Sequence, residues 1–404
     1  MNNSIFNFEI DFEKSLNGYI FDKKTKKKYL DFFGQYSTLT LGYNSKLFNK
    51  KKIHTKLSKI FPQKIVNCEL ETDVYNDFRD IFKKKLGLGV YKYFHFCSTG
   101  ALAVEAAIKT AITASKFKSN RIIVFKGSFH GINGYGGIFT DRFSPIDERL
   151  NNFPGSYISH VDISTMAHGL QNESQLNIRS IIKQLQKKIT LEKVSAVLIE
   201  PIQSTYGDRY FNKKFFIELE KICIKNHIPL IFDEIQTGFY TTGKKWYLQH
   251  LGITPDIVIF GKKTQVSGIM VNDKYSDIFK QELKLNVTWN SDIIDMYRCN
   301  LIINFIEKNK LLKKISKFSD EITKFLNNFT EITNTRSCGY LFAFDLKNKI
   351  ERDNLVNKLF SYGVLVNPTR ENSIRLRPNL NTSLQEINFF KKSFTKSINE
   401  IKFK

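Results

Sequence analysis

Short apolar runs alternate with segments of helical periodicity between residues 91 and 261. The runs are YKYFHF at 91–96, RIIVF at 121–125, SAVLIEPI at 195–202, IPLIFDEI at 228–235 and DIVIFG at 256–261. Each is mostly apolar on both faces, which is typical of parallel strands covered by helices on both sides of a sheet. Between them, ALAVEAAIKTAITASK at 101–116 and FFIELEKICIKNH at 215–227 are predicted to be helices. The pattern predicts an α/β fold with a mostly parallel central sheet.

The pattern changes near residue 295. Two helical segments, near 295–309 and 311–328, lead to the runs GYLFAFDL at 339–346, GVLVNP at 363–368 and SIRLRP at 373–378. Helices followed by short strands indicate a smaller α+β lobe. We therefore predict a large domain over 41–294, a small C-terminal domain over 295–404, and an N-terminal segment, 1–40, that packs with the small domain.

The chain of 404 residues has a net charge of +23. A strong positive charge can indicate a nucleic-acid or membrane-surface partner. Here, however, the lysines are spread along the whole chain, and the densest run, Lys23 to Lys28, lies in a predicted β-hairpin turn. No nucleic-acid-binding motif accompanies them, so the charge indicates a solvated surface and no nucleic-acid partner.

The five cysteines are scattered, odd in number and never in a C-x-x-C spacing. This argues against a disulfide framework or a metal site and fits a reducing compartment. The N-terminal residues MNNSIFNFEIDFEKS do not have the pattern of a secretory signal, and no apolar stretch approaches the ~20 residues that span a bilayer. We expect a cytoplasmic protein with no membrane partner.

Two short turns that follow predicted strands could bind a ligand. Ser98-Thr99-Gly100-Ala101 opens the Ala-rich helix, and N–H groups at a helix N-terminus bind phosphate. Phe129-His130-Gly131 follows RIIVF, and an aromatic side chain at the end of a strand can stack on a planar cofactor ring. Taken alone, each turn has a commoner structural interpretation. The first would be a capped helix, and the second a core phenylalanine beside a partly exposed histidine.

Two charged residues end apolar strands. Asp233, in FDEIQTG, would be a costly buried carboxylate unless it had a partner, and a protonated pyridine nitrogen is one such partner. Gln236 could then contact the phenolic oxygen of the same ring. Lys262, in FGKKTQ, follows the next strand, where desolvation would lower its pKa and let the neutral amine attack an aldehyde. Alone, these would be a helix-capping aspartate and a surface lysine, but both strand ends should face one crevice.

The ordered set STGALAVEAAIKTA, FHG, EPIQ, FDEIQTG and FGKKTQV resembles the class III (ω-amino acid) aminotransferases. Within that class the chain most resembles the L-lysine 6-aminotransferases, on the phrases GALAVE, GKKTQV-x-G and TWNSDIIDMYRC. The resemblance extends from about residue 18 to the end of the sequence. It implies fold type I, as in aspartate aminotransferase, with pyridoxal 5'-phosphate (PLP) bound in the 41–294 domain. It also implies an amine and a 2-oxo acid as substrates.

The resemblance also implies a role for each matching position. Lys262 would form the Schiff base with PLP, Asp233 would bind the pyridinium nitrogen, and Gln236 the phenolic oxygen. Phe129 would stack on the ring, and Lys263 would have no chemical role. The cofactor phosphate would be bound by Thr99, Gly100, Ala101 and, from the other subunit of a homodimer, Thr288.

The positions that would contact the substrate match the family less well. Arg375 matches the arginine that clamps the carboxylate of the 2-oxo acid, a task suited to a planar guanidinium. Where lysine aminotransferases have an arginine after FHG, this chain has Ile132. Where they have a glutamate after EPIQ that pairs with the clamp arginine, it has Thr205. Our hypothesis is that the donor is not simply lysine bound in the family's usual way.

The expected reaction transfers a terminal amino group from an L-lysine-like donor to a 2-oxo acid such as 2-oxoglutarate, with Lys262 moving the proton. One alternative is the same reaction with another ω-amino acid or amine as donor. Another is a mutase or decarboxylase reaction on the same PLP scaffold. A non-catalytic nucleic-acid-binding role has the least support, because Lys262, Asp233 and Gln236 are all present.

Overall fold

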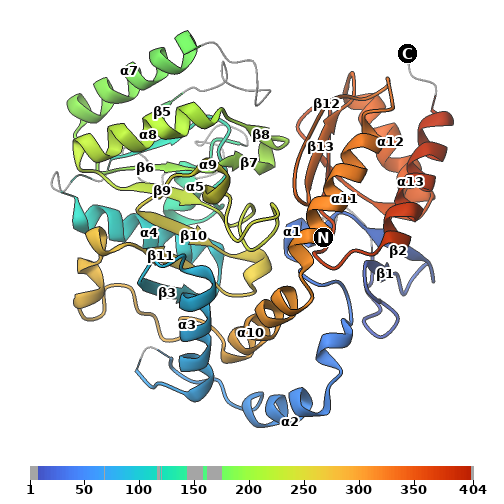
Figure 1. The fold of residues 1–404 in the computed structure, drawn as a ribbon, viewed down its shortest axis with the longest axis horizontal. Coiled ribbons are helices and arrows are strands. Elements are labelled where there is room, and N and C mark those ends of the chain that lie inside the picture. The colour runs from blue at the N-terminus through green and yellow to red at the C-terminus, as the bar shows by residue number, and fades with distance from the viewer. Residues whose placement is uncertain are drawn as a thin grey trace. The chain divides into compact units, whose positions relative to one another are not determined.

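The computed structural model describes residues 8–67, 69–115, 119, 121–142, 158–161 and 175–401. The chain forms two compact units (Figure 1). The large unit consists of Gln63–Phe239 and Lys244–Asn300, and the small unit of Met1–Pro62, Tyr240–Gly243 and Leu301–Lys404. The domain boundaries predicted at residues 40 and 294 stay a prediction.

A seven-stranded sheet in the order β3-β11-β10-β9-β6-β4-β5 forms the centre of the large unit. Strands β10, β9, β6, β4 and β5 are parallel, and β11 is antiparallel to both of its neighbours, β10 and β3. This confirms the predicted α/β fold with a mostly parallel sheet. The strands are β3 Tyr93–Cys97, β4 Ile122–Phe125, β5 Ile158–Val161, β6 Ala196–Ile199, β9 Leu230–Asp233, β10 Ile257–Phe260 and β11 Ser267–Val271, with a separate pair β7 Ile202–Gln203 and β8 Arg209–Tyr210.

The helices of the large unit cover both faces of this sheet. They are α3 Asp73–Leu86, α4 Gly100–Ala114, α5 Gly134–Phe139, α7 Gln175–Glu192, α8 Lys213–Asn226 and α9 Leu248–Leu251, and α10 Ile293–Lys308 continues into the small unit. Alternate residues of a strand point to opposite faces. Ile122 and Val124 of β4 pack in one cluster with α4, whereas Phe125 packs against Phe215 of α8. Helix α7 lies beside α8 (Figure 1).

The small unit contains two sheets, in the orders β12-β13-β16-β15 and β1-β2-β14. Its strands are β1 Tyr19–Phe21, β2 Lys28–Asp31, β12 Thr333–Cys338, β13 Leu341–Asp345, β14 Val364–Leu365, β15 Asn367–Thr369 and β16 Ser373–Leu376. Its helices are α1 Gly34–Ser37, α2 Lys51–Ile60, α11 Leu311–Leu326, α12 Lys349–Ser361 and α13 Leu384–Asn399. The antiparallel pairing of β1 and β2 confirms the hairpin predicted around the lysine run.

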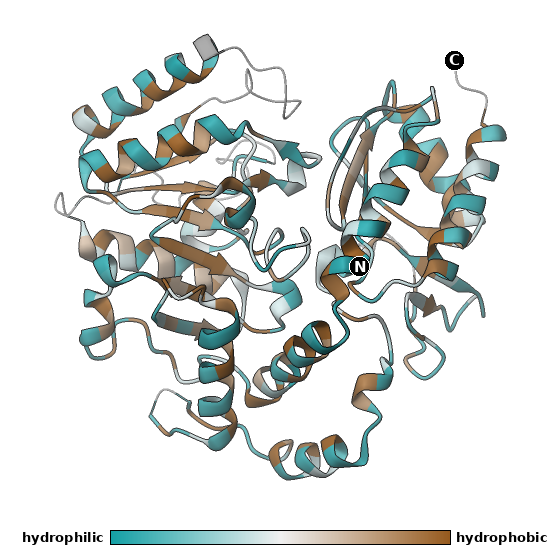
Figure 2. Cartoon of the chain, in the orientation of Figure 1, coloured by the Kyte–Doolittle hydropathy of each residue, from teal (hydrophilic) through white to brown (hydrophobic). Residues whose placement is uncertain are grey.

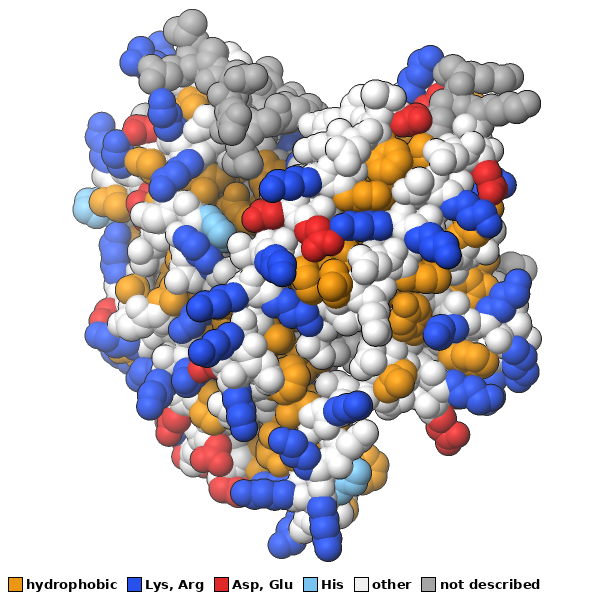
Figure 3. Space-filling view, turned by 45° about the vertical axis from the view of Figure 1, so that its right-hand side comes forward, with side chains coloured by type: hydrophobic (Ala, Val, Ile, Leu, Met, Phe, Trp, Pro, Cys, Tyr) orange, Lys and Arg blue, Asp and Glu red, His pale blue; other side chains and the backbone are white. Residues whose placement is uncertain are grey.

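Hydrophobic residues are concentrated in the strands of the seven-stranded sheet, and the helices alternate between hydrophobic and hydrophilic positions (Figure 2). Lysine and arginine side chains are scattered over the face drawn in Figure 3. Within the described part of the chain, no helix is both long enough and apolar enough to span a membrane.

Candidate active site

Two predicted site residues stand at the ends of neighbouring parallel strands. Asp233 is the last residue of β9 and pairs with Ile259 of β10. The N–H of Glu234 donates a hydrogen bond to the Ile259 carbonyl oxygen at 2.9 Å, which extends the pairing past the end of β9. Lys262 begins a 3₁₀ turn two residues after the end of β10. The parallel register therefore brings Asp233 and Lys262 to the same edge of the sheet.

Close packing around Ile235 joins three predicted segments at this edge. A Cβ placed on Gly100, at the start of α4, would lie 3.0 Å from Cδ1 of Ile235. A Cβ on Gly261, just before Lys262, would lie 3.5 Å from Cγ2 of the same side chain. The loop after β4 joins them, because a Cβ on Gly131 would lie 3.9 Å from Cβ of Ala101. The turns that contain STGA, FHG, DEIQ and GKK thus converge.

The Asp233 carboxylate is buried and has two partners. Its Oδ2 lies 2.8 Å from Nδ1 of His130, and its Oδ1 accepts a hydrogen bond from the Ile235 N–H at 3.1 Å. A buried carboxylate is costly without such partners. His130 is only 2% exposed, so the alternative of a partly exposed histidine is wrong. Gln236 is half-buried on the same turn as Asp233.

Glu200, directly after β6, belongs to the site but was missed in the sequence. Its Oε1 accepts a hydrogen bond from the Phe129 N–H at 2.7 Å and thereby fixes the loop that carries the half-buried Phe129. Burial and, next, the charge of Asp233 raise the pKa of Glu200 well above its ordinary value, against the opposing effect of Lys262. The signal was a carboxylate directly after the apolar run AVLI, the same kind that identified Asp233.

The N-terminus of α4 has the features of an anion site. Thr99 is the N-cap, and its hydroxyl accepts a hydrogen bond from the Leu102 N–H at 3.4 Å. The Ala103 N–H donates a hydrogen bond to the Thr99 carbonyl oxygen at 3.1 Å. The N–H groups of Gly100 and Ala101 come before this first helical hydrogen bond, so the helix itself offers them no acceptor. The first turn holds no acidic side chain. Exposed N–H groups and the helix dipole both favour an anion such as phosphate.

The loop that carries Thr288 lies beside this turn in the same chain. The Ser98 hydroxyl donates a hydrogen bond to the Trp289 carbonyl oxygen at 3.1 Å, and Lys64 Nζ is 4.3 Å from the centroid of the Trp289 ring. Thr288 itself is exposed. Which subunit's phosphate Thr288 contacts stays a prediction.

Lys262 is half-buried and has a φ of +54°, in the left-handed region that few residues other than glycine adopt. Gln265, at the end of the same turn, has a φ of +64°. Such backbone persists only where the surrounding structure holds it, and it is concentrated at functional sites. Exposed lysines of this chain, such as Lys26 and Lys310, have a similar φ, so it is the half-burial of Lys262 that distinguishes it from a solvated surface lysine. Its neighbour Lys263 is 2% exposed.

The predicted substrate positions are placed differently. Ile132 is 63% exposed. Thr205 lies in the 3₁₀ turn Ser204–Tyr206, and its carbonyl oxygen accepts a hydrogen bond from Arg142 Nε at 2.8 Å. Arg375 belongs to β16 of the small unit, where it is buried and donates a hydrogen bond from Nη2 to Asn367 Oδ1 at 3.1 Å.

The fold and the residues at its strand ends define a PLP-dependent enzyme of fold type I. A model of the family Aminotransferase class-III matches residues 1–398, so the chain belongs to the class III aminotransferases. This confirms the family resemblance, and with it PLP as the cofactor.

Individual relatives differ in the donor that their names state. An L-lysine-epsilon aminotransferase of Mycobacterium tuberculosis is 30% identical over 402 residues, a match that covers 94% of this chain and 89% of the relative. A 4-aminobutyrate aminotransferase of Saccharomyces cerevisiae is 28% identical, and the match covers 98% of this chain and 91% of the relative. A solved lysine aminotransferase from M. tuberculosis, in the internal aldimine form, has a TM-score of 0.92 and 26% identity, covering 99% of this chain and 96% of that one. The likeness to lysine aminotransferases is confirmed, but similarity alone does not identify the donor.

The residues of the large unit fit PLP. A buried carboxylate, paired on one side with His130, suits a ring nitrogen that carries a proton. The N–H groups of Gly100 and Ala101 suit its phosphate, and the half-buried Lys262 at the same sheet edge suits its aldehyde.

Proposed function

We propose that this aminotransferase moves a terminal amino group from an L-lysine-like donor to a 2-oxo acid such as 2-oxoglutarate. The observation that carries the proposal is the pairing of β9 with β10, which puts Asp233 and Lys262 at adjacent strand ends. A lysine and a carboxylate can act on the same small cofactor only if they lie at the same edge of the sheet. The likeness to L-lysine-epsilon aminotransferases supports the choice of donor class.

Bound PLP supplies an electron sink that stabilises negative charge on the substrate carbon next to nitrogen. In our proposal Lys262 holds the cofactor and its ε-amine takes the proton from that carbon. Asp233 accepts a hydrogen bond from the ring N–H, with His130 fixing its carboxylate. Gln236 contacts the phenolic oxygen, Phe129 packs on the ring, and Arg375 holds the carboxylate of the 2-oxo acid.

A changed donor is the second candidate, and two positions favour it. Ile132 gives one side of the expected pocket an exposed apolar group. Thr205 cannot form an ion pair with Arg375, so that arginine could bind a carboxylate in both half-reactions. The donor would then be another ω-amine whose distal group is not bound in the way that the family binds lysine.

A homodimer is also part of the proposal. Leu102, Val287 and Trp289 are 41%, 47% and 51% exposed, and all three lie close in sequence to the predicted phosphate-binding residues. Grouped apolar exposure of this kind marks interaction surfaces. A second subunit that covers these side chains would bring its own Thr288 toward the cofactor phosphate.

The purified enzyme should be offered lysine, ornithine and 4-aminobutyrate, each with 2-oxoglutarate, and glutamate production should be followed. Glutamate formation from at least one terminal amine supports the proposal, and the ranking of kcat/KM identifies the donor. If lysine is far better than the others, the changed-donor candidate is wrong. Conversion of an amine without any 2-oxo acid would instead support a mutase or decarboxylase.

A further inference from the structure

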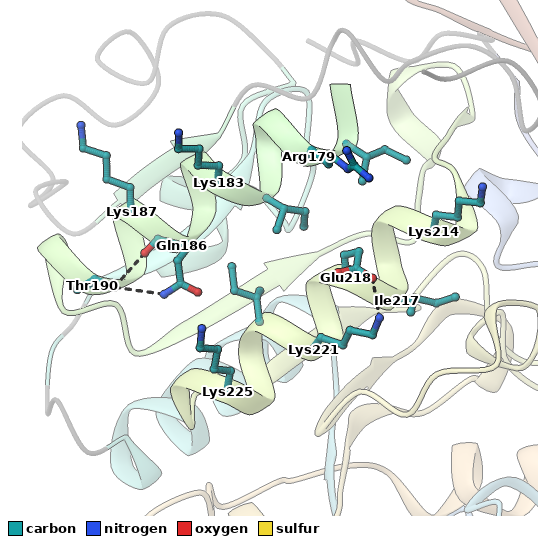
Figure 4. A pocket seen from close by; sticks show the side chains of 13 residues that line it. Arg179, Lys183, Gln186, Lys187, Thr190, Lys214, Ile217, Glu218, Lys221 and Lys225 are labelled. Atoms are coloured by element: carbon teal, nitrogen blue, oxygen red, sulfur yellow. Dashed lines mark hydrogen bonds and ion pairs between the residues drawn. The ribbon is translucent and has the colours of Figure 1, made fainter. Parts of the chain in front are cut away.

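A groove of about 1080 Å³ lies between α7 and α8 of the large unit, outside the candidate active site (Figure 4). Two amide hydrogen bonds between Gln186 and Asn226, of 3.1 and 3.3 Å, tie the helices together. Four isoleucines contribute the apolar part of the lining: Ile178, Ile182, Ile217 and Ile222. The first and last of these are buried and the middle two half-buried, so apolar surface remains available in the groove.

Basic side chains line this groove along both helices. Six basic residues and one acidic residue contribute: Arg179, Lys183, Lys187, Lys214, Lys221, Lys225 and Glu218. Lys183 and Lys187 are four residues apart on α7, as are Lys221 and Lys225 on α8, so each pair shares one helix face. Like charges at this spacing destabilise a helix, and bound negative charge would relieve that repulsion. Among the described residues that line the groove, Lys221 alone has an acidic partner there, Glu218 at 2.7 Å.

The groove has the length of a short helix. Its lining on α7 runs from Ile178 to Thr190, about 18 Å at 1.5 Å per residue, and on α8 from Lys214 to Lys225, about 16 Å. Three helical turns have this length, and a bound amphipathic helix typically anchors itself through aliphatic side chains spaced by three or four residues. Because the whole chain is basic, charge alone would not distinguish this surface. The combination of positive charge with an isoleucine-lined groove does distinguish it.

We propose that this groove docks an amphipathic helix of a partner protein, with an aliphatic stripe against the isoleucines and Asp or Glu side chains against the lysines. Positive charge repeated along both helices is matched best by negative charge repeated along the occupant. A second copy of this chain is a poor occupant, because its net charge of +23 repels a basic surface.

Other classes of occupant fit less well. A bilayer surface would meet the exposed lysines, but the buried Ile178 and Ile222 would not reach its acyl chains. A fatty acid has a single carboxylate, which would leave most of the six basic side chains without a negative partner. Single-stranded nucleic acid is bound through aromatic stacking, and no aromatic side chain is among the described residues that line the groove.

Binding to the PLP-loaded enzyme can be measured by fluorescence anisotropy with a labelled synthetic peptide. The peptide would have about 18 residues, enough for three bound turns, with leucines at positions i, i+3, i+4 and i+7 and glutamates beside them. A scrambled peptide of equal composition and a peptide with lysine in place of glutamate are its controls. We expect a Kd on the order of 10 μM for the amphipathic acidic peptide and much weaker binding of both controls.

Two paired variants test where the peptide binds. Lys183→Glu/Lys187→Glu and Ile182→Asn/Ile217→Asn should each weaken binding by about tenfold or more, since truncation of central contacts costs this much. The matched control Lys313→Glu/Lys317→Glu makes the same charge change on exposed positions of α11 and should change the Kd less than about twofold. Transaminase activity should persist in all three and shows that each variant is folded.

Equal binding of the scrambled peptide would overturn the proposal, as would equal loss in the α11 control or no binding of the acidic peptide. Competition experiments with the labelled peptide test the other classes of occupant. Displacement of the peptide by oleate, by phosphatidylglycerol vesicles or by a single-stranded oligonucleotide, at concentrations below the peptide Kd, would assign the groove to that ligand instead. Self-association that the α7 variant abolishes would assign it to a second copy.

Discussion

Two strand-end carboxylates and the two positions at which the chain departs from the lysine aminotransferases are held in different ways. Asp233 and Glu200 are buried at strand ends, and their carboxylates have hydrogen-bond partners at 2.7 to 3.1 Å. Ile132 is 63% exposed on a loop, and Thr205 lies in a short 3₁₀ turn. In our proposal, the edge of the sheet therefore holds groups that the PLP reaction needs, while the loops with Ile132 and Thr205 set the choice of donor. The predictions below test whether this division holds.

The largest effect is expected at Lys262. We expect Lys262→Ala to lower kcat by at least about 10⁴-fold, the upper end of what a positioned acid–base group contributes. The visible absorbance of the bound cofactor should shift as well, because the amine that holds it is gone. Steady-state kinetics and absorbance spectra check both. Lys263→Met is the control, since Lys263 is buried beside Lys262 but has no proposed chemical role. An inactive Lys263→Met with an active Lys262→Ala would reverse the assignment.

Asp233→Asn should have the next largest effect. It keeps the size of the side chain but removes the charge that we propose to bind the ring N–H. We expect kcat to fall by about 10²–10³-fold, as for loss of a single preorganised electrostatic contact.

The adjacent Glu234→Gln is its control. Glu234 accepts hydrogen bonds from the Tyr247 and Leu248 N–H groups at 2.6 and 2.8 Å, which is an anchoring role. Glu234→Gln should lower the denaturation midpoint more than kcat. If it lowers kcat as much as Asp233→Asn does, Asp233 has no special part in the chemistry.

Glu200 gives a smaller effect that depends on pH. Glu200→Ala leaves the partly buried Phe129 N–H without its acceptor and should cost about 1 kcal/mol of unfolding free energy, whereas Glu200→Gln keeps an acceptor. Because the folded state raises the pKa of Glu200, the folded state binds this proton more tightly than the unfolded state. Stability from this group is therefore complete below 4.5, the ordinary glutamate pKa, and is lost as pH rises through the folded pKa.

Denaturant unfolding of the wild type and Glu200→Gln between pH 4.5 and 8 measures that difference. The wild type should lose stability relative to Glu200→Gln as pH rises, because the glutamine cannot ionise. A constant difference over this range would mean that Glu200 ionises in the folded protein as easily as in the unfolded one.

The strands and the cofactor residues could be predicted because their signals are local. The runs that became β4, β6, β9 and β10 are apolar on both faces, and Asp233 and Lys262 follow two of them directly. Helix α13 was not predicted, although its capping box of Ser383 and Glu386 is visible as SLQE. Strand β11 was also missed. Only six residues separate it from β10, too few for the crossover of about a dozen that a parallel strand needs, so its antiparallel direction follows once the strand is recognised.

Long-range partners had no local signal. The contact of His130 with Asp233 joins residues 103 apart in the sequence, and that of Phe129 with Glu200 joins residues 71 apart. Both depend on β4, β6 and β9 being neighbours in one sheet, an order that periodicity does not give. The histidine was consequently expected to be partly exposed, whereas Glu200 itself, directly after an apolar run, did have a local signal.

The smallest effect, and the sharpest test of the division, is a change of substrate preference. Ile132→Arg combined with Thr205→Glu places the residues typical of lysine aminotransferases at both positions. If loops alone set the donor, kcat/KM for lysine should rise by about tenfold relative to 4-aminobutyrate, the size of one modest binding contact. Because Ile132 is exposed, Ile132→Arg should leave the unfolding midpoint unchanged, whereas Thr205→Glu replaces a buried hydroxyl and should lower it; neither should change the cofactor spectrum. Lys313→Glu, on exposed α11, is the control for a change of surface charge. A double variant with altered cofactor absorbance and unaltered donor ranking would mean that these loops support the cofactor, and the two regions could then not be separated.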